Sequence, residues 1–144
     1  MIGLIQRVSH ASVIVGDQSC REIGRGLLLF LGIQKTDTFL KSEKMLSKVL
    51  NYRVFSDNKG HMNLSLKDIN GSLMIVSQFT LAADTKKGSR PSFSAAASPE
   101  LAEKLYDGFV EAAKALVPVE TGQFGVDMEV SLINEGPVTF QLEI

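Results

Sequence analysis

The stretch SLMIVSQFT, residues 72–80, decides how the rest of the chain is organised. Its first half is apolar and partly β-branched, which is typical of a strand buried on both faces. Its second half turns polar without a Gly or Pro to break the strand. An unpaired buried polar group costs about 1–3 kcal/mol. The stretch therefore predicts either a strand end tied down by side-chain hydrogen bonds or a ligand site, and the residue pattern alone favours the first.

Length and composition predict one domain over residues 1–144. The single cysteine, Cys20, excludes an intramolecular disulfide. The first residues lack the basic and then apolar pattern of a signal peptide. The longest apolar run, residues 27–31, is too short to span a bilayer. We therefore expect a soluble cytoplasmic protein that makes no contact with a membrane.

The charge balance argues against a protein whose overall field attracts nucleic acid. The chain carries 15 basic and 16 acidic residues, a net charge of −1, which leaves room only for a local basic patch. Trp is absent and aromatic residues make up 7% of the chain. This composition also argues against a stacking platform for single-stranded nucleic acid.

Two segments predict amphipathic helices. The first follows N-cap candidates at residues 36–38 and carries Lys41, Lys44 and Lys48 on a solvated basic face. The second begins with an N-cap serine and a proline at residues 98–99 and ends before Pro118.

Strands and turns account for most of the remaining sequence. Clean alternation over 126–133 predicts a half-buried strand, and residues 134–137 (NEGP) predict a turn before the last strand. Residues 81–98 show no period, and a loop of this length inside a domain is usually functional. The expected strands are residues 2–8, 11–15, 19–23, 27–33, 52–55, 62–66, 72–80, 126–133 and 138–142.

These elements predict a mixed α/β chain of the α+β-like type, with roughly eight strands and two helices. We expect a curved, partly closed, barrel-like β-sheet. The two helices should pack on one outer face, which gives three layers in the order α/β/β.

Most catalytic templates are missing from the sequence. The two histidines, His10 and His61, have no metal-ligand spacing to each other or to Cys20. There is no Gly-rich phosphate loop, and no acidic pair stands out. We expect neither a metal nor a cofactor. Two stretches remain as candidates for chemistry, residues 77–80 (SQFT) and 134–139 (NEGPVT).

The Gly136-Pro137 pair between two expected strands is most simply a turn. About 5–6% of X-Pro bonds in folded proteins are cis, however. A cis Gly-Pro would hold its two carbonyls in a fixed position, where they could serve as a rigid selector.

Several motifs together give the chain a resemblance to a known family. From end to end it resembles the D-aminoacyl-tRNA deacylases of the widespread bacterial and eukaryotic type. The SQ-x-T and N-x-GPVT motifs, about sixty residues apart, are highly specific together and weak separately. The motifs that carry the resemblance are residues 5–8 (IQRV), 52–57 (YRVFSD), 62–64 (MNL), 77–81 (SQFTL), 90–93 (RPSF) and 134–139 (NEGPVT).

This resemblance implies hydrolysis of the ester between a D-amino acid, or glycine, and the terminal ribose of tRNA. It implies a homodimer in which a cis Gly136-Pro137 enters the partner's active site. The carbonyls of that motif would face the substrate's α-carbon and reject an L-residue sterically. The implied catalytic residues are Ser77, Gln78, Phe79 and Thr80, with Arg7 holding the Gly-Pro motif and Phe124 forming a pocket wall.

Ester hydrolysis needs a nucleophile and donors for the developing oxyanion. Backbone N–H groups near Phe79 and Thr80 are the candidate donors. The Thr80 hydroxyl would need a base, and the sequence shows none beside it. We therefore favour a mechanism in which the 2′-hydroxyl of the tRNA assists a water molecule.

The loop of residues 81–98 carries Lys86, Lys87 and Arg90 and is called the basic loop. These three residues are the leading candidates for contact with tRNA, followed by the lysines of the first helix. Two alternatives stay open at this point. One is a general esterase with Thr80 as nucleophile, and the other is a non-catalytic RNA-binding module that uses the same loop.

Overall fold

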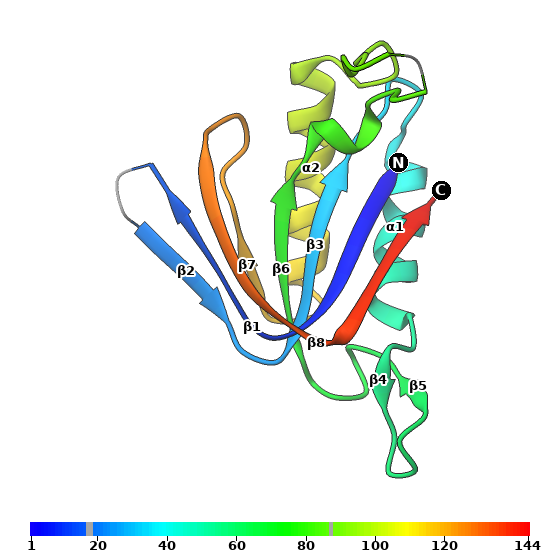
Figure 1. The fold of residues 1–144 in the computed structure, drawn as a ribbon, viewed down its shortest axis with the longest axis vertical. Coiled ribbons are helices and arrows are strands. Elements are labelled where there is room, and N and C mark those ends of the chain that lie inside the picture. The colour runs from blue at the N-terminus through cyan, green and yellow to red at the C-terminus, as the bar shows by residue number, and fades with distance from the viewer. Residues whose placement is uncertain (17–18, 87) are drawn as a thin grey trace.

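The computed structural model of the chain describes residues 1–16, 19–86 and 88–144 (Figure 1). The composition of residues 16–18 (GDQ) predicts a hairpin turn, which falls mostly outside the described residues. Lys87, a predicted tRNA contact, also lies outside them. Neither α-helix of the described ranges combines the length and hydrophobicity that crossing a membrane requires.

The described residues form eight strands, two α-helices and one 3-10 turn, in agreement with the predicted content. The strands are β1 (Ile2–Val15), β2 (Ser19–Ile23), β3 (Gly26–Gly32), β4 (Phe55–Ser56), β5 (Met62–Leu64), β6 (Ser72–Ser77), β7 (Val119–Thr121) and β8 (Met128–Glu143). The helices are α1 (Phe39–Asn51) and α2 (Pro99–Lys114), and the 3-10 turn is η1 (Phe79–Ala82).

Six of the strands form one mixed sheet that folds back on itself. Strand β1 pairs with β8 along its whole length, and its other edge pairs first with β3 and then with β2. Strands β3, β6 and β7 run parallel to one another. Strand β2 also approaches β6 and β7 without pairing with either in the sheet, and the Arg21 side chain donates to the Thr121 carbonyl of β7 at 2.7 Å. The predicted barrel-like, partly closed sheet is thus confirmed, and Figure 1 shows its curvature.

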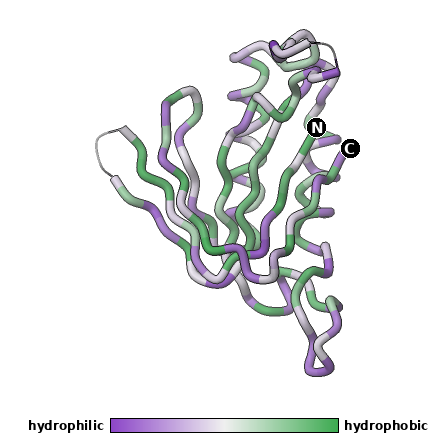
Figure 2. Tube along the Cα trace, in the orientation of Figure 1, coloured by the Kyte–Doolittle hydropathy of each residue, from purple (hydrophilic) through white to green (hydrophobic). Residues whose placement is uncertain are grey.

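The central strands are buried on both faces because each face meets a different core. On β6, Leu73 and Ile75 pack in the core beneath the two helices, whereas Met74 and Val76 face the part of the sheet that folds over. Strand β3 alternates in the same way. Figure 2 shows these strands as the apolar centre of the molecule. The arrangement gives the expected three layers, helices, sheet and folded-over sheet.

Both helices begin where the sequence predicts. The Thr38 hydroxyl accepts a hydrogen bond from the Lys41 N–H, and the Ser98 hydroxyl accepts one from the Leu101 N–H, each at 3.4 Å. Pro99 follows Ser98 at the first helical position, where a missing N–H costs nothing. The second cap fixes where the loop of residues 81–98 ends.

Several strand predictions were wrong. The strand expected at 52–55 overlaps β4 only at Phe55. The two strands expected at 2–8 and 11–15 are one strand, β1. The strand expected over 72–80 ends at Ser77, where the chain turns into η1. Strand β7 was not predicted, because three residues after Pro118 are too few to show a period.

The turn predicted at residues 134–137 is also wrong. Strand β8 continues through these residues, bending together with β1 (Figure 1), and pairs antiparallel with β1 on both sides of them. Gln6 pairs with Thr139 and Val8 pairs with Asn134, so residues 135–138 stand opposite Arg7 alone. The Gly-Pro sequence therefore forms a wide bulge that projects from the sheet rather than a hairpin.

Gly26 offers a test of the close contact between β3 and β6. A Cβ at this position would overlap the Ser72 carbonyl oxygen, which is backbone and cannot move aside cheaply. We expect Gly26→Ala to lower the free energy of unfolding by about 1–3 kcal/mol, as other overpacking substitutions do. Urea denaturation followed by circular dichroism measures the change.

Gly24→Ala is the matched control, because nothing lies within 4 Å of a Cβ built there. Its free energy of unfolding should stay within about 0.5 kcal/mol of the parent value. Equal destabilisation by the two substitutions would contradict the close approach of β3 and β6.

Candidate active site

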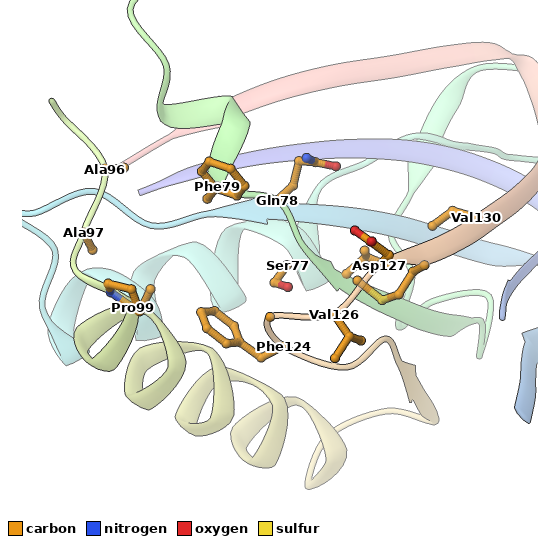
Figure 3. Close-up of a pocket in the computed structure, with 14 residues that line it drawn as sticks. Ser77, Gln78, Phe79, Ala96, Ala97, Pro99, Phe124, Val126, Asp127 and Val130 are labelled. Carbon is orange, nitrogen blue, oxygen red and sulfur yellow. The ribbon is translucent and has the colours of Figure 1, made fainter. Parts of the chain in front are cut away.

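A cavity of about 540 Å³ opens at the carboxyl end of β6 (Figure 3). Its wall comes from the end of β6, the start of η1, the start of α2 and the turn that precedes β8. Most of the lining is apolar, including Phe124. Ser77 and Gln78 supply polar groups, and Phe79 lies at the rim. The structure thus places three of the four predicted catalytic residues, and the predicted wall residue Phe124, around one cavity.

The end of β6 is held rigidly. The Gln78 N–H donates to the Leu31 carbonyl at 2.8 Å, which extends the pairing with β3 one residue beyond the strand. Turn η1 then packs over Gly32, where an added Cβ would lie 2.8 Å from the Leu81 Cβ. The chain at Phe79 and Thr80 is therefore fixed by backbone contacts on two sides.

Thr80 faces solvent and does not line the cavity among the described residues. Its Oγ1 accepts a hydrogen bond of 2.6 Å from the Gln78 Nε2. This bond pairs two of the polar side chains of residues 72–80, as predicted for a strand end that is tied down by side-chain hydrogen bonds. The described histidines belong to other parts of the chain, since His10 contacts Glu22 and His61 follows the β4–β5 turn.

The backbone N–H groups of Phe79 and Thr80 begin a 3-10 turn, where amides have no acceptor within the turn. Neither donates a hydrogen bond to another described residue. Two free, rigidly held donors next to a cavity can stabilise negative charge on an incoming carbonyl oxygen.

Phe124 packs against the ring of Tyr106, a residue of α2. The two rings lie 5.9 Å apart, and the Tyr106 hydroxyl donates to the Ile75 carbonyl at 3.0 Å. Burial of this hydroxyl, with a smaller contribution from the negative charge of Asp107, raises the pKa of Tyr106 to about 12. The hydroxyl therefore stays protonated and keeps donating to the Ile75 carbonyl of β6 throughout the neutral range.

Asp127 is a cavity residue that the sequence did not reveal. The alternating pattern over 126–133 places it on the solvent face of a strand, but the strand begins only at Met128. A turn containing Gly125, with φ of +74°, brings Asp127 to the cavity instead. It is the only ionisable side chain among the described residues of the lining, and Figure 3 shows it across from Gln78.

The Gly136-Pro137 bulge is held open by side chains. Asn134 spans it, accepting from the Val138 N–H at 2.7 Å and donating to the Val138 carbonyl at 3.2 Å. The Gly136-Pro137 peptide bond is cis, and both residues are exposed. Gly136 has φ of +152°, a value that L-residues rarely adopt.

Arg7 anchors the bulge to the body of the domain. Its Nε donates to the Glu135 carbonyl at 2.7 Å, and its Nη1 donates to the Val54 carbonyl at 2.6 Å. Arg25 lies 3.7 Å from the Glu135 carboxylate and adds an exposed ion pair. Hydrogen bonds from a charged donor are stronger than neutral ones, so Arg7 adds a strong restraint to those that Asn134 makes.

The bulge and the cavity lie at opposite ends of the central strands. Arg7, opposite the bulge, pairs with Leu27, which pairs with Leu73 near the start of β6. Ser77 stands four residues further along that strand, about 13 Å at 3.3 Å per residue. One copy of the chain therefore does not bring Gly136-Pro137 to its own cavity.

The basic loop beside the cavity is closed at its neck. The N–H of Asp84 donates to the Ser92 carbonyl at 2.8 Å, and the reverse bond measures 3.0 Å. Lys86 and Arg90 are exposed beyond this neck. The predicted basic face of α1 is less available to tRNA than expected. Lys41 pairs with Asp37 and Lys48 donates to the Glu143 carbonyl, each at 3.3 Å.

Within the described ranges, no three side chains of the metal-binding types gather closely enough to hold an ion.

Comparisons with known proteins agree with these motifs. The D-aminoacyl-tRNA deacylase of Pasteurella multocida (strain Pm70) is 58% identical, over the whole of both chains. That of Hahella chejuensis (strain KCTC 2396) is 57% identical, over the whole of this chain and 99% of its own.

Solved structures show the same fold. The c-Myc DNA Unwinding Element Binding Protein superposes with a TM-score of 0.94 at 42% identity, over 100% of this chain and 99% of its own. A probable eukaryotic D-amino acid tRNA deacylase superposes with a TM-score of 0.87 at 17% identity, over 99% of this chain and 98% of its own, which shows a shared fold alone.

The sequence model of the D-Tyr-tRNA(Tyr) deacylase family matches residues 4–143. The chain therefore belongs to the D-Tyr-tRNA(Tyr) deacylase family of hydrolases.

Proposed function

We propose that this deacylase cleaves the ester between a D-amino acid and the terminal ribose of tRNA, and also removes glycine from mischarged tRNA. One observation carries the proposal: two free backbone donors stand beside a largely apolar cavity of about 540 Å³. Attack on the ester carbonyl creates an oxyanion, and each well-placed donor contributes about 2.7–4 kcal/mol to its stabilisation. Phe79 and Thr80 act through their N–H groups.

Water is the nucleophile in this proposal, and the 2′-hydroxyl of the terminal ribose assists its attack. The motivating observation is that the Thr80 hydroxyl faces solvent, is engaged by Gln78, and has no described imidazole beside it. A threonine hydroxyl without a base is a weak nucleophile. The 2′-hydroxyl lies next to the ester in every aminoacyl-tRNA, so the substrate itself supplies the missing group.

Asp127 complements the one cation that the aminoacyl end carries, its α-ammonium group. The only carboxylate among the described lining residues favours a positively charged partner. With the ester carbonyl at Phe79 and the ammonium at Asp127, two of the four groups around the α-carbon are fixed.

Handedness is selected by a second copy of the chain. In the proposed homodimer, the exposed Gly136-Pro137 bulge of one subunit enters the cavity of the other. Its carbonyls then face the substrate's α-carbon. A D-residue directs its side chain outward, an L-residue would collide with the bulge, and glycine has no side chain to collide. The support is the rigid anchoring by Arg7 and Asn134, together with the distance of the bulge from its own cavity.

The direct test compares D-tyrosyl-tRNA with L-tyrosyl-tRNA. Release of D-tyrosine well above spontaneous hydrolysis, with little release of L-tyrosine, is the expected result. A non-catalytic RNA-binding module would release neither above background. Equal release of the two would mean that the bulge does not select handedness.

Replacing Thr80 separates the two candidate nucleophiles. If water attacks, Thr80→Ala keeps substantial activity because its N–H remains, whereas D-tyrosyl-tRNA with a 2′-deoxy terminal ribose is not cleaved. Initial rates on the two substrates measure both effects. Near-complete loss of activity in a folded Thr80→Ala dimer would instead establish Thr80 as a covalent nucleophile, as in a general esterase that also cleaves small D-amino acid esters.

The salt dependence of tRNA binding tests the role of the basic loop. If Lys86 and Arg90 contact phosphates of the tRNA end, each alanine substitution should reduce the slope of log affinity against log salt by about 0.7. Binding of uncharged tRNA over a salt series measures the slope. Lys67→Ala, an exposed lysine in the turn before β6, is the control and should keep the parent slope. An unchanged slope in the loop variants would exclude them as contacts.

A further inference from the structure

Arg21 is a charged residue on the inner face of the folded-over sheet. Its neighbours on β2, Cys20 and Glu22, are exposed, whereas Ile23 is buried in the core beneath the folded-over sheet. Because successive side chains of a strand point to opposite faces, Arg21 and Ile23 share the inward face. A charged group on such a face destabilises the fold unless hydrogen-bond partners meet it there.

The partners of Arg21 are groups at the end of β7. Its Nη1 donates to the Thr121 carbonyl at 2.7 Å and also contacts the Thr121 Oγ1 and the Gly122 carbonyl oxygen, each at 3.3 Å. Strands β2 and β7 are the two end strands of the order β2-β1-β3-β6-β7, and among the described residues no backbone pairing joins them. The Arg21 side chain therefore closes the sheet where the backbone leaves it open.

The segment that Arg21 holds leads directly into the wall of the cavity. Residues 124–128 all line the cavity, and Figure 3 shows part of this wall. Only Gly122 and Gln123 separate the wall from the end of β7. The Gly122 N–H donates to the Ile75 carbonyl at 3.0 Å, which ties the same point to β6. The wall thus begins from two anchors, backbone pairing on one side and the guanidinium of Arg21 on the other.

The backbone donors of the proposed site have separate anchors. Phe79 and Thr80 directly follow Gln78, whose N–H donates to the Leu31 carbonyl at 2.8 Å. That hydrogen bond joins the end of β6 to β3 and involves neither β2 nor β7. Loss of the Arg21 side chain should therefore loosen the cavity wall and leave the two donors in place.

We propose that Arg21 is a positioning residue, which fixes the cavity wall of residues 124–128 and thereby sets how tightly the aminoacyl end of tRNA binds. This inference rests on the proposed function. In that function, Phe124 and Asp127 contact the aminoacyl group before the attack as well as during it. A loosened wall therefore weakens binding of the substrate and of the transition state alike, which raises KM and leaves kcat nearly unchanged.

Amide hydrogen exchange tests the positioning itself, without reference to activity. Arg21→Met keeps an apolar stem but has no donor. Peptides that cover residues 119–128 should exchange about 10-fold faster in this variant, as the loss of a hydrogen bond from a charged donor would cause. Peptides that cover residues 72–82 should keep the parent rate. Faster exchange in both segments, or in neither, would overturn the inference.

Steady-state kinetics on D-tyrosyl-tRNA test the consequence for binding. Arg21→Met should raise KM by about 10-fold, the lower end of what losing a hydrogen bond from a charged donor causes, while kcat stays near the parent value. Partial unfolding would instead lower kcat at an unchanged KM. Arg21→Lys should recover most of the loss in KM, because all the contacts of Arg21 come from one nitrogen, which an ammonium group can replace.

Lys114→Met is the matched control for the lost positive charge. Lys114 and Arg21 both line a second cavity, of about 560 Å³, which shares Phe124 with the first. Lys114 pairs with Glu111 at 2.9 Å rather than with the end of β7. The control should keep the parent KM and the parent exchange rates. An equal rise in KM for Lys114→Met and Arg21→Met would assign the effect to charge alone and would overturn the inference.

The outcomes distinguish this inference from the proposed function. A parent enzyme that cleaves D-tyrosyl-tRNA, together with an Arg21→Met variant of unchanged KM, would overturn the role of Arg21 alone. A parent enzyme that releases no D-tyrosine from tRNA would refute the proposed function itself. In that case the exchange rates of residues 119–128 would still decide whether Arg21 holds the cavity wall.

Discussion

The parallel pairing of β3 with β6 is the constraint on which the rest of the structure depends. Both strands are apolar on both faces, so they must lie between two cores, with helices on one side and the folded-over sheet on the other. Gly26 permits the two backbones to approach closely at one end. At the other end, the Leu31 carbonyl holds Gln78 and turns the chain into η1. The cavity and its backbone donors are a direct consequence of where this strand pair stops.

The same pairing fixes how far the bulge lies from the cavity. Strand β1 is bound on one edge to β3, and on its other edge it carries β8. The residues that interrupt β8 face Arg7, near the start of β3, and the charged hydrogen bonds of Arg7 keep them projecting outward. Each subunit therefore has a cavity at one end and a rigid projection at the other. In the proposed two-fold dimer, each projection would enter the cavity of the other subunit.

Local sequence signals were sufficient for much of the fold. The apolar composition of β6, the caps at Thr38 and Ser98, and the two cores follow from periodicity and side-chain chemistry. Strand β7 escaped prediction because it is held by pairing with β6 rather than by its own pattern. The Gly-Pro bulge has the composition of a turn, and only the pairing of β1 on both sides of it shows that β8 continues.

The site was less predictable, for a related reason. Residues 77–80 stood out because polar groups end an apolar strand. Asp127 did not, since its place in an alternating pattern assigns it to solvent, and the turn at Gly125 that redirects it leaves little trace in the sequence. The contact between Phe79 and Phe93 joins residues fourteen positions apart across a loop without any period. Contacts of this kind depend on tertiary structure, which propensities do not contain.

The most direct measurement of the central claim mixes two variants that are each defective in a different part. Ala97→Trp fills the cavity, and Gly136→Val disrupts the bulge, because a Cβ there would lie 2.8 Å from the Val138 nitrogen. Ala97→Trp homodimers should cleave neither D- nor L-tyrosyl-tRNA, whereas Gly136→Val homodimers should cleave both, because no intact bulge rejects the L-residue. If the bulge of one subunit enters the cavity of the other, subunit exchange in an equal mixture places an intact bulge at half of the open cavities. Exchange should then lower the release of L-tyrosine by about half and leave the release of D-tyrosine unchanged. Release of L-tyrosine that stays the same after exchange would contradict a site built from two copies of the chain.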